Sequence, residues 1–167
     1  MDRADSCCFT GHRSSRLPWG DDETDPRCLD LKERLAGALE GAYNSGCRHF
    51  ICGMAQGSDL YFAEAVLALR QVHPEITLEA AVPFVGQADR WPEADRLRWQ
   101  RLLDQCDFET MVQHHYTAGC MARRNRYMVD RSGLLIAVYD GQPQGGTLNT
   151  LTYAMRHGVE TVILDVE

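Results

Sequence analysis

Short runs of β-forming residues alternate with longer helical stretches along the whole chain, and this alternation limits the fold more than any other feature. The runs rich in β-formers are Cys7 to Phe9, His49 to Cys52, Ile76 to Val82, Thr110 to Gln113, Leu134 to Tyr139 and Thr161 to Asp165. Strands joined through single helices make right-handed crossovers and pair in parallel. The sequence therefore predicts an α/β fold, a Rossmann-like three-layer sandwich with a mainly parallel sheet of about six strands.

The stretches between these runs place apolar residues at helical spacing, which is typical of amphipathic helices packed on a sheet. Asp25 supplies an N-cap, Pro26 suits the first helical position, and Gly46 provides a stop. The predicted helices cover Asp25 to Gly46, Ser58 to Gln71, Glu93 to Asp107, Ala118 to Arg131 and the segment around Leu148 to Met155.

Length and charge limit the classes of function. A chain of 167 residues is expected to form one domain over 1–167. With 17 basic against 24 acidic residues the net charge is -7, so no general basic field attracts nucleic acid, and such a partner is not expected. No signal-peptide core or apolar run of about 18 residues is present, which favours a cytoplasmic location and no membrane insertion.

No metal site is expected either. The seven cysteines include no CxxC pair, and the adjacent His114 and His115 have no second ligand pair at zinc-like spacing. His114, His115 and Tyr116 are interpreted as a polar loop, because no acid or nucleophile is placed by sequence to work with them. Trp91 lies in a loop, where its indole either stacks on a base or packs against the next helix.

A glycine-rich turn, GMAQGSD, joins the second predicted strand directly to the second helix. Gly53 and Gly57 would let the backbone approach a ligand, and the helix start at Ser58 offers free N–H groups to an anion. The alternative is that the glycines only permit a tight turn and that Ser58 or Asp59 only caps the helix. Either interpretation fits the sequence.

A second glycine turn, formed by Gly145, Gly146 and Thr147, precedes the last helix. Thr147 either donates to a phosphate or caps the helix. In an open parallel sheet, ligands bind beyond the carboxyl ends of the strands, so both turns fall on the ligand edge. His12 and Arg13 follow the first strand at the same edge, as ligand contacts or as solvated loop charge. Two turns on one edge favour phosphate binding.

The fourth helix carries a positive cluster of Arg123, Arg124 and Arg126 in an otherwise acidic chain. Helical spacing allows one or two of the three side chains to point inward, and the others to form a solvated face.

Four segments in order resemble the SLOG superfamily, and most of all its YpsA branch of bacterial proteins. They are FTGHR (Phe9 to Arg13), GMAQGSD (Gly53 to Asp59), RNRYMVDRSGLLIAVYDG (Arg124 to Gly141) and GGTLNT (Gly145 to Thr150). The superfamily is named after the DNA-processing protein DprA and the LOG phosphoribohydrolases. The resemblance implies a Rossmann-like fold, binding of nucleotides or their derivatives, no required cofactor and a tendency to form homo-oligomers.

The LOG enzymes carry an R-K-x-x-M helix and a P-G-G-x-G-T-x-x-E segment, whose arginine and glutamate serve hydrolysis of an N-glycosidic bond. Arg124 and Met128 match that helix, and Gly146 and Thr147 match the phosphate-binding G-T. Thr150 stands where the glutamate is expected, and threonine carries no charge at neutral pH. The LOG reaction is therefore not simply inherited, although Asp59 or Asp140 could replace the acid.

Three functions remain as hypotheses. The first is binding or sensing of a nucleotide-derived phosphate ligand. The second is an altered N-glycosidic hydrolase with Arg124, Asp59 and Asp140 as catalytic candidates, and the third is a protein-interaction module with a vestigial pocket. The predicted ligand residues are Thr10, Gly11, His12, Arg13, Gly53, Met54, Ala55, Gly57, Ser58, Asp59, Arg124, Asp140, Gly145, Gly146 and Thr147.

Overall fold

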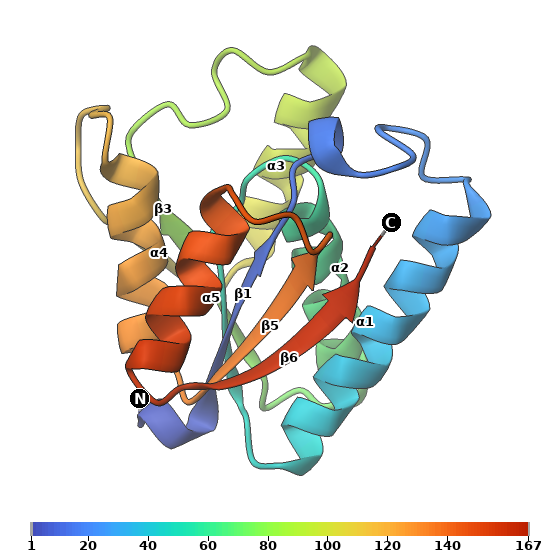
Figure 1. Ribbon diagram of the computed structural model, residues 1–167, viewed down its shortest axis with the longest axis vertical. Coiled ribbons are helices and arrows are strands. Elements are labelled where there is room, and N and C mark those ends of the chain that lie inside the picture. The colour runs from blue at the N-terminus through green and yellow to red at the C-terminus, as the bar shows by residue number, and fades with distance from the viewer. Residues whose placement is uncertain (1, 167) are drawn as a thin grey trace.

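The computed structural model describes residues 2–166, and its centre is one parallel sheet of six strands in the order β4-β3-β2-β1-β5-β6 (Figure 1). The strands are β1 (Ser6–Gly11), β2 (His49–Cys52), β3 (Thr77–Val82), β4 (Phe108–Met111), β5 (Leu134–Tyr139) and β6 (Glu160–Asp165). Every neighbouring pair is parallel. The predicted Rossmann-like α/β fold is confirmed.

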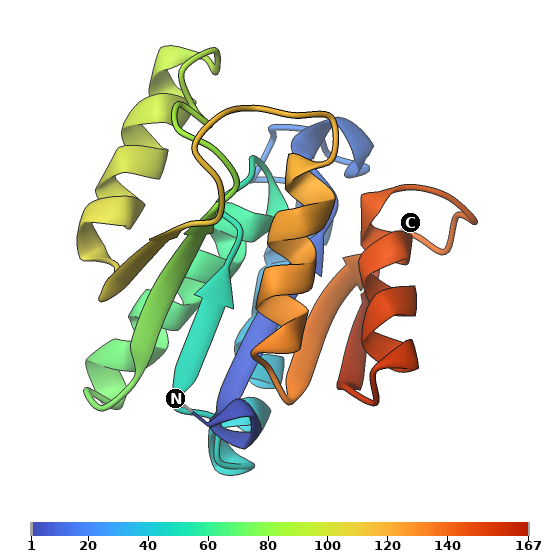
Figure 2. The ribbon, with the colours of Figure 1, turned by 90° about the vertical axis from the view of Figure 1, so that its left-hand side faces the viewer.

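Five helices connect the strands and cover both faces of the sheet. They are α1 (Pro26–Asn44), α2 (Ser58–Val72), α3 (Glu93–Gln105), α4 (Cys120–Asp130) and α5 (Gly146–Arg156). In Figure 2, α4 and α5 lie in front of the sheet and α1 and α2 behind it, and α3 packs against α2. Alternating strands and helices thus produce three layers.

The core is split by the sheet into two parts. Behind the sheet, Leu31, Leu35 and Leu39 of α1 are buried at helical spacing, and Phe9 of β1 stacks on Phe62 of α2 with ring centroids 4.7 Å apart. The smaller part lies under α4 and α5, where Met128 is 1% exposed. Both faces of β1 are therefore covered, which explains why the consecutive residues Cys7, Cys8 and Phe9 are all fully buried.

The strand order reverses at β1, and this reversal positions the site. From β1 the chain passes through α1 to β2 on one side, while β5 lies on the other side of β1 and leads into α5 on the opposite face (Figure 1). The connections after β1 and β5 therefore diverge, and a crevice remains between them at the carboxyl ends of the strands.

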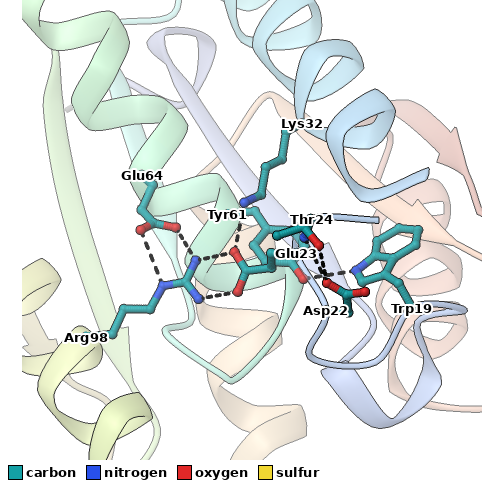
Figure 3. A network of polar contacts seen from close by, with 8 residues as sticks. All are labelled: Trp19, Asp22, Glu23, Thr24, Lys32, Tyr61, Glu64 and Arg98. Carbon is teal, nitrogen blue, oxygen red and sulfur yellow. Dashed lines mark hydrogen bonds and ion pairs between the residues drawn. The ribbon is translucent and has the colours of Figure 1, made fainter. Parts of the chain in front are cut away.

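The connection from β1 to α1 is tied to α2 and α3 by a polar network (Figure 3). Trp19 Nε1 donates to the Tyr61 hydroxyl over 3.1 Å, and Arg98 pairs with both Glu23 and Glu64. Lys32 adds a 2.8 Å ion pair to Glu23. This connection is polar in sequence, but it is anchored at several points in the structure.

The helix α3 ends two residues before Asp107, the residue at which the third helix is predicted to end. The edge strand β4 begins two residues before Thr110, the residue at which the fourth strand is predicted to begin. Asp107 Oδ2 accepts a hydrogen bond from the Leu78 N–H, and the Asp107 N–H donates to the Leu78 carbonyl, both over 2.8 Å. Asp107 therefore joins β3 rather than α3. Side-chain periodicity cannot show this competition for backbone partners.

Replacing Leu31 by alanine should lower the free energy of unfolding by about 2–5 kcal/mol, because Leu31 is fully buried between α1 and the sheet. Leu29 lies on the same helix and is 52% exposed, so Leu29→Ala should change stability by less than about 0.5 kcal/mol. Urea unfolding of both variants measures the difference, and equal losses would contradict the packing described for α1.

Candidate functional site

A cavity of about 200 Å³ opens where β1 and β5 end, and we call it the phosphate cavity after the ligand that we propose for it below. Nine of the predicted ligand residues line it, namely Thr10, Gly11, His12, Arg13, Ala55, Asp59, Arg124, Gly146 and Thr147. Five further residues line it that the sequence analysis missed, namely Phe9, Ser15, Arg16, Met121 and Asn125. The other six predicted residues, Gly53, Met54, Gly57, Ser58, Asp140 and Gly145, are absent from its wall.

His12 joins the ends of β1 and β5 to the start of α5. It is 3% exposed, its Nε2 accepts a 3.0 Å hydrogen bond from the Asp140 N–H, and its Nδ1 lies 3.4 Å from the Thr147 hydroxyl oxygen. Burial lowers the pKa of His12, although the Asp140 carboxylate opposes this effect. His12 is therefore neutral at pH 7, and the positive charge of the site comes from arginines.

Arg16 holds the loop after β5 in place. It lies in a 3-10 turn (η2, Ser14–Arg16), and its Nη2 pairs with the Asp140 carboxylate at 2.9 Å. Desolvation raises the pKa of Asp140, but the Gln142 N–H, His12 and Arg16 outweigh it and hold that pKa below its usual value. A side chain at Gly145 would collide with the Arg16 guanidinium, so this glycine makes room for the ion pair. Asp140 is thus an ionised structural partner.

Arg124 is the one buried member of the arginine cluster, while Arg123 and Arg126 are exposed. Its Nη1 donates to the Gly53 carbonyl at the end of β2 and to the Ala81 carbonyl in β3. A Cβ atom at Gly53 would lie 2.7 Å from the Arg124 Cζ. Gly53 therefore allows a guanidinium to lie across the ends of two strands and face the cavity.

Asp59 is the carboxylate that lines the cavity, and it is 5% exposed. Its Oδ2 accepts a 3.0 Å hydrogen bond from the Ala55 N–H. Burial raises the pKa of Asp59, and the charge of Arg124 opposes this rise. The group is therefore protonated more readily than an exposed aspartate.

The turn before α2 is used to hold the β1 connection. The Ser58 N–H and hydroxyl both donate to the His12 carbonyl, at 3.2 and 2.8 Å. Gly57 has a φ of 85°, and a Cβ atom there would lie 2.5 Å from the Ser14 nitrogen. Met54 is fully buried with a φ of 60°. The Ser58 donors are thus already engaged within the protein.

The turn before α5 faces the cavity. Gly145, with a φ of 107°, precedes the first helical residue Gly146, so Gly146 and Thr147 belong to α5 rather than to the predicted turn before it. The first N–H groups of a helix have no acceptor within it and carry partial positive charge. Arg13 is exposed and forms no ion pair with any residue in 2–166. Together with Arg124, these donors suit an anion.

Two further observations concern metals and membranes. Within residues 2–166, no group of three or more His, Cys, Asp or Glu side chains is arranged to hold a metal ion. None of the helices in that range is long and apolar enough to cross a membrane.

Replacing Gly57 by alanine should destabilise the protein by about 1–3 kcal/mol, because its backbone conformation and the nearby Ser14 backbone both exclude a side chain. Gly41 lies inside α1 with no atom within 4 Å of an added Cβ, so Gly41→Ala should be neutral or stabilising. Thermal unfolding compares the two, and a tolerated Gly57→Ala would contradict the close approach to the β1 connection.

Relatives with similar sequences are bacterial. The uncharacterized SPbeta prophage-derived protein YoqJ of Bacillus subtilis is 30% identical over 145 residues, which is 79% of this chain and 84% of YoqJ. The UPF0398 protein SERP1017 of Staphylococcus epidermidis is 26% identical over 138 residues, covering 81% of this chain and 73% of that protein. The UPF0398 protein BH1768 of Halalkalibacterium halodurans is 32% identical over 117 residues, covering 69% and 62%.

A similar fold occurs in DNA processing protein A from Helicobacter pylori, which was solved to describe its single-stranded DNA binding mode. The TM-score is 0.66 with 14% sequence identity, over 99% of this chain and 67% of that one. The model of the YspA SLOG family (YpsA) matches residues 7–165, nearly the whole length. The chain therefore belongs to the YspA SLOG family.

Proposed function

We propose that this protein binds the phosphate group of a nucleotide or nucleotide derivative in the phosphate cavity. The proposal rests mainly on one observation. Arg13, Arg124 and the first turn of α5, at Gly146 and Thr147, all line the same cavity. Guanidinium groups and free helix N–H groups are the donors that phosphate oxygens prefer. The neutral His12 orients Thr147 without adding charge.

The rest of the ligand would lie in the groove between α4 and α5, a cavity of about 300 Å³. Met121, Asn125 and Gly146 line both cavities, so the groove continues the phosphate cavity. Pockets for small organic ligands usually enclose about 300–1,000 Å³, more than the phosphate cavity offers alone. The Asn149 amide in the groove can hydrogen-bond to the edge of a base.

Binding without turnover fits the side chains better than hydrolysis does. At the position of the LOG glutamate, the Thr150 hydroxyl donates to the Gly146 carbonyl over 2.9 Å. Asp140 is paired with Arg16. A second candidate, N-glycosidic hydrolysis, is favoured only by Asp59, which lines the cavity and has a pKa raised by burial, as a general acid requires.

Single-stranded DNA is a further ligand to test beside the nucleotides. The acidic composition argued against a nucleic-acid partner, but the likeness to a single-stranded DNA-binding protein does not support that expectation. Arg13, Arg16 and Arg124 concentrate positive charge in one cavity of an acidic chain. A protein-interaction role, self-association and a cytoplasmic location remain proposals of lower rank.

The Arg13→Ala variant should bind AMP and ADP at least about tenfold more weakly than the unmodified protein, because an unpaired guanidinium at the phosphate would be lost. Arg156→Ala serves as the control, since Arg156 is an exposed arginine at the far end of α5. Isothermal titration calorimetry measures both variants. Absence of any nucleotide binding would contradict the proposal and favour an interaction module with a vestigial pocket.

The Asp59→Asn variant should bind AMP about two- to fivefold more tightly, because it removes a carboxylate from beside the bound phosphate. We expect the unmodified protein to leave AMP intact during prolonged incubation, as chromatography of the nucleotide would show. Release of free adenine that disappears in Asp59→Asn would instead establish the hydrolase.

A further inference from the structure

A second cavity, which we call the aromatic cavity, opens at the same edge of the sheet beyond β3 and β4. It encloses about 740 Å³ between the β3–α3 and β4–α4 connections. The Val85 N–H donates to the His114 carbonyl over 3.0 Å, which holds the two connections together. The proposed binding of a nucleotide phosphate does not use this cavity.

Aromatic side chains line the aromatic cavity. Phe84 and Tyr116 meet edge to face with centroids 5.2 Å apart, and Tyr116 is 65% exposed. Trp91 also lines the cavity, is half-buried, and meets Trp99 edge to face at 6.5 Å. Exposed aromatic faces stack on planar heteroaromatic rings, and such stacking is the usual way in which proteins hold bases.

Charged groups beside these rings match the remainder of a nucleoside phosphate. Asp89 and Arg90 are exposed and line the cavity. A carboxylate accepts hydrogen bonds from the hydroxyl groups of a ribose, and a guanidinium pairs with phosphate oxygens. Rings, a carboxylate and a cation in one cavity therefore suit a nucleoside joined to phosphate.

The aromatic cavity and the phosphate cavity have no lining residue in common, but one lining residue of each bonds to the same backbone carbonyl. Gln87 lines the aromatic cavity, is 6% exposed, and donates from Nε2 to the Gly53 carbonyl over 3.0 Å. The same carbonyl oxygen accepts from Arg124 Nη1, and Arg124 lines the phosphate cavity. Trp99 Nε1 donates to Gln87 Oε1 over 3.3 Å and fixes the orientation of the amide. One carbonyl group thus lies between the two cavities.

We propose that the aromatic cavity binds a second nucleoside, so that the ligand is a dinucleotide in which pyrophosphate joins two nucleosides. This inference rests on the proposed phosphate site. The groove between α4 and α5, the phosphate cavity and the aromatic cavity then accept nucleoside, phosphate and nucleoside in turn.

The test compares NAD, which has two nucleosides, with ADP, which has one, by calorimetry on the full chain. NAD should bind at least about tenfold more tightly than ADP, and Tyr116→Ala should remove that advantage without changing ADP affinity. Phe108→Ala is the matched control, because Phe108 is an aromatic residue, 49% exposed, at the start of β4 and outside the aromatic cavity. NAD but not ADP should quench tryptophan fluorescence, and Trp91→Phe should abolish the quenching.

Three results would overturn the dinucleotide assignment. In the first, ADP binds but NAD binds no more tightly, which leaves the phosphate site intact. In the second, a short oligothymidylate binds more tightly than NAD and depends on Tyr116, which assigns the aromatic cavity to single-stranded DNA. In the third, neither nucleotide binds, and the proposed function fails together with the inference.

Discussion

The positions of β1 and β5 in the sheet make the site possible. The two strands are hydrogen-bonded neighbours, yet the helices that follow them pack on opposite faces, so no helix covers the point where both strands end. His12 links the elements that surround this point. Its carbonyl accepts both Ser58 donors at α2, and its ring contacts the Asp140 N–H and the Thr147 hydroxyl.

Charge is distributed unevenly around this point. Burial keeps His12 neutral, and Arg16 neutralises Asp140. Arg124 is held by backbone carbonyls rather than by a carboxylate within ion-pair distance, and Arg13 is free of ion pairs within residues 2–166. An acidic protein thus presents two guanidinium groups that lack a carboxylate partner within residues 2–166, and a helix N-terminus, to one small cavity. Binding an anion would complete the neutralisation that the protein leaves unfinished.

The fold was predictable because alternating strands and helices allow few arrangements, and the ligand edge followed from parallel pairing. The side chains that finish the site were harder to predict. The turn after Arg13 places Arg16 beside Asp140, and the packing of α4 places Asn125 in the cavity wall. Gly53 and Gly57 were expected to approach a ligand, but they accommodate Arg124 and Ser14, because sequence does not show which atoms approach a glycine.

In the proposed complex, phosphate lies at the start of α5 rather than at the turn before α2. Backbone amide NMR during titration with AMP tests it most directly, since an N–H that donates to phosphate changes its chemical shift strongly. We expect the largest shifts at Gly146 and Thr147, with much smaller shifts at Gly57 and Ser58. The largest shifts at Gly57 and Ser58, or none in either turn, would contradict it.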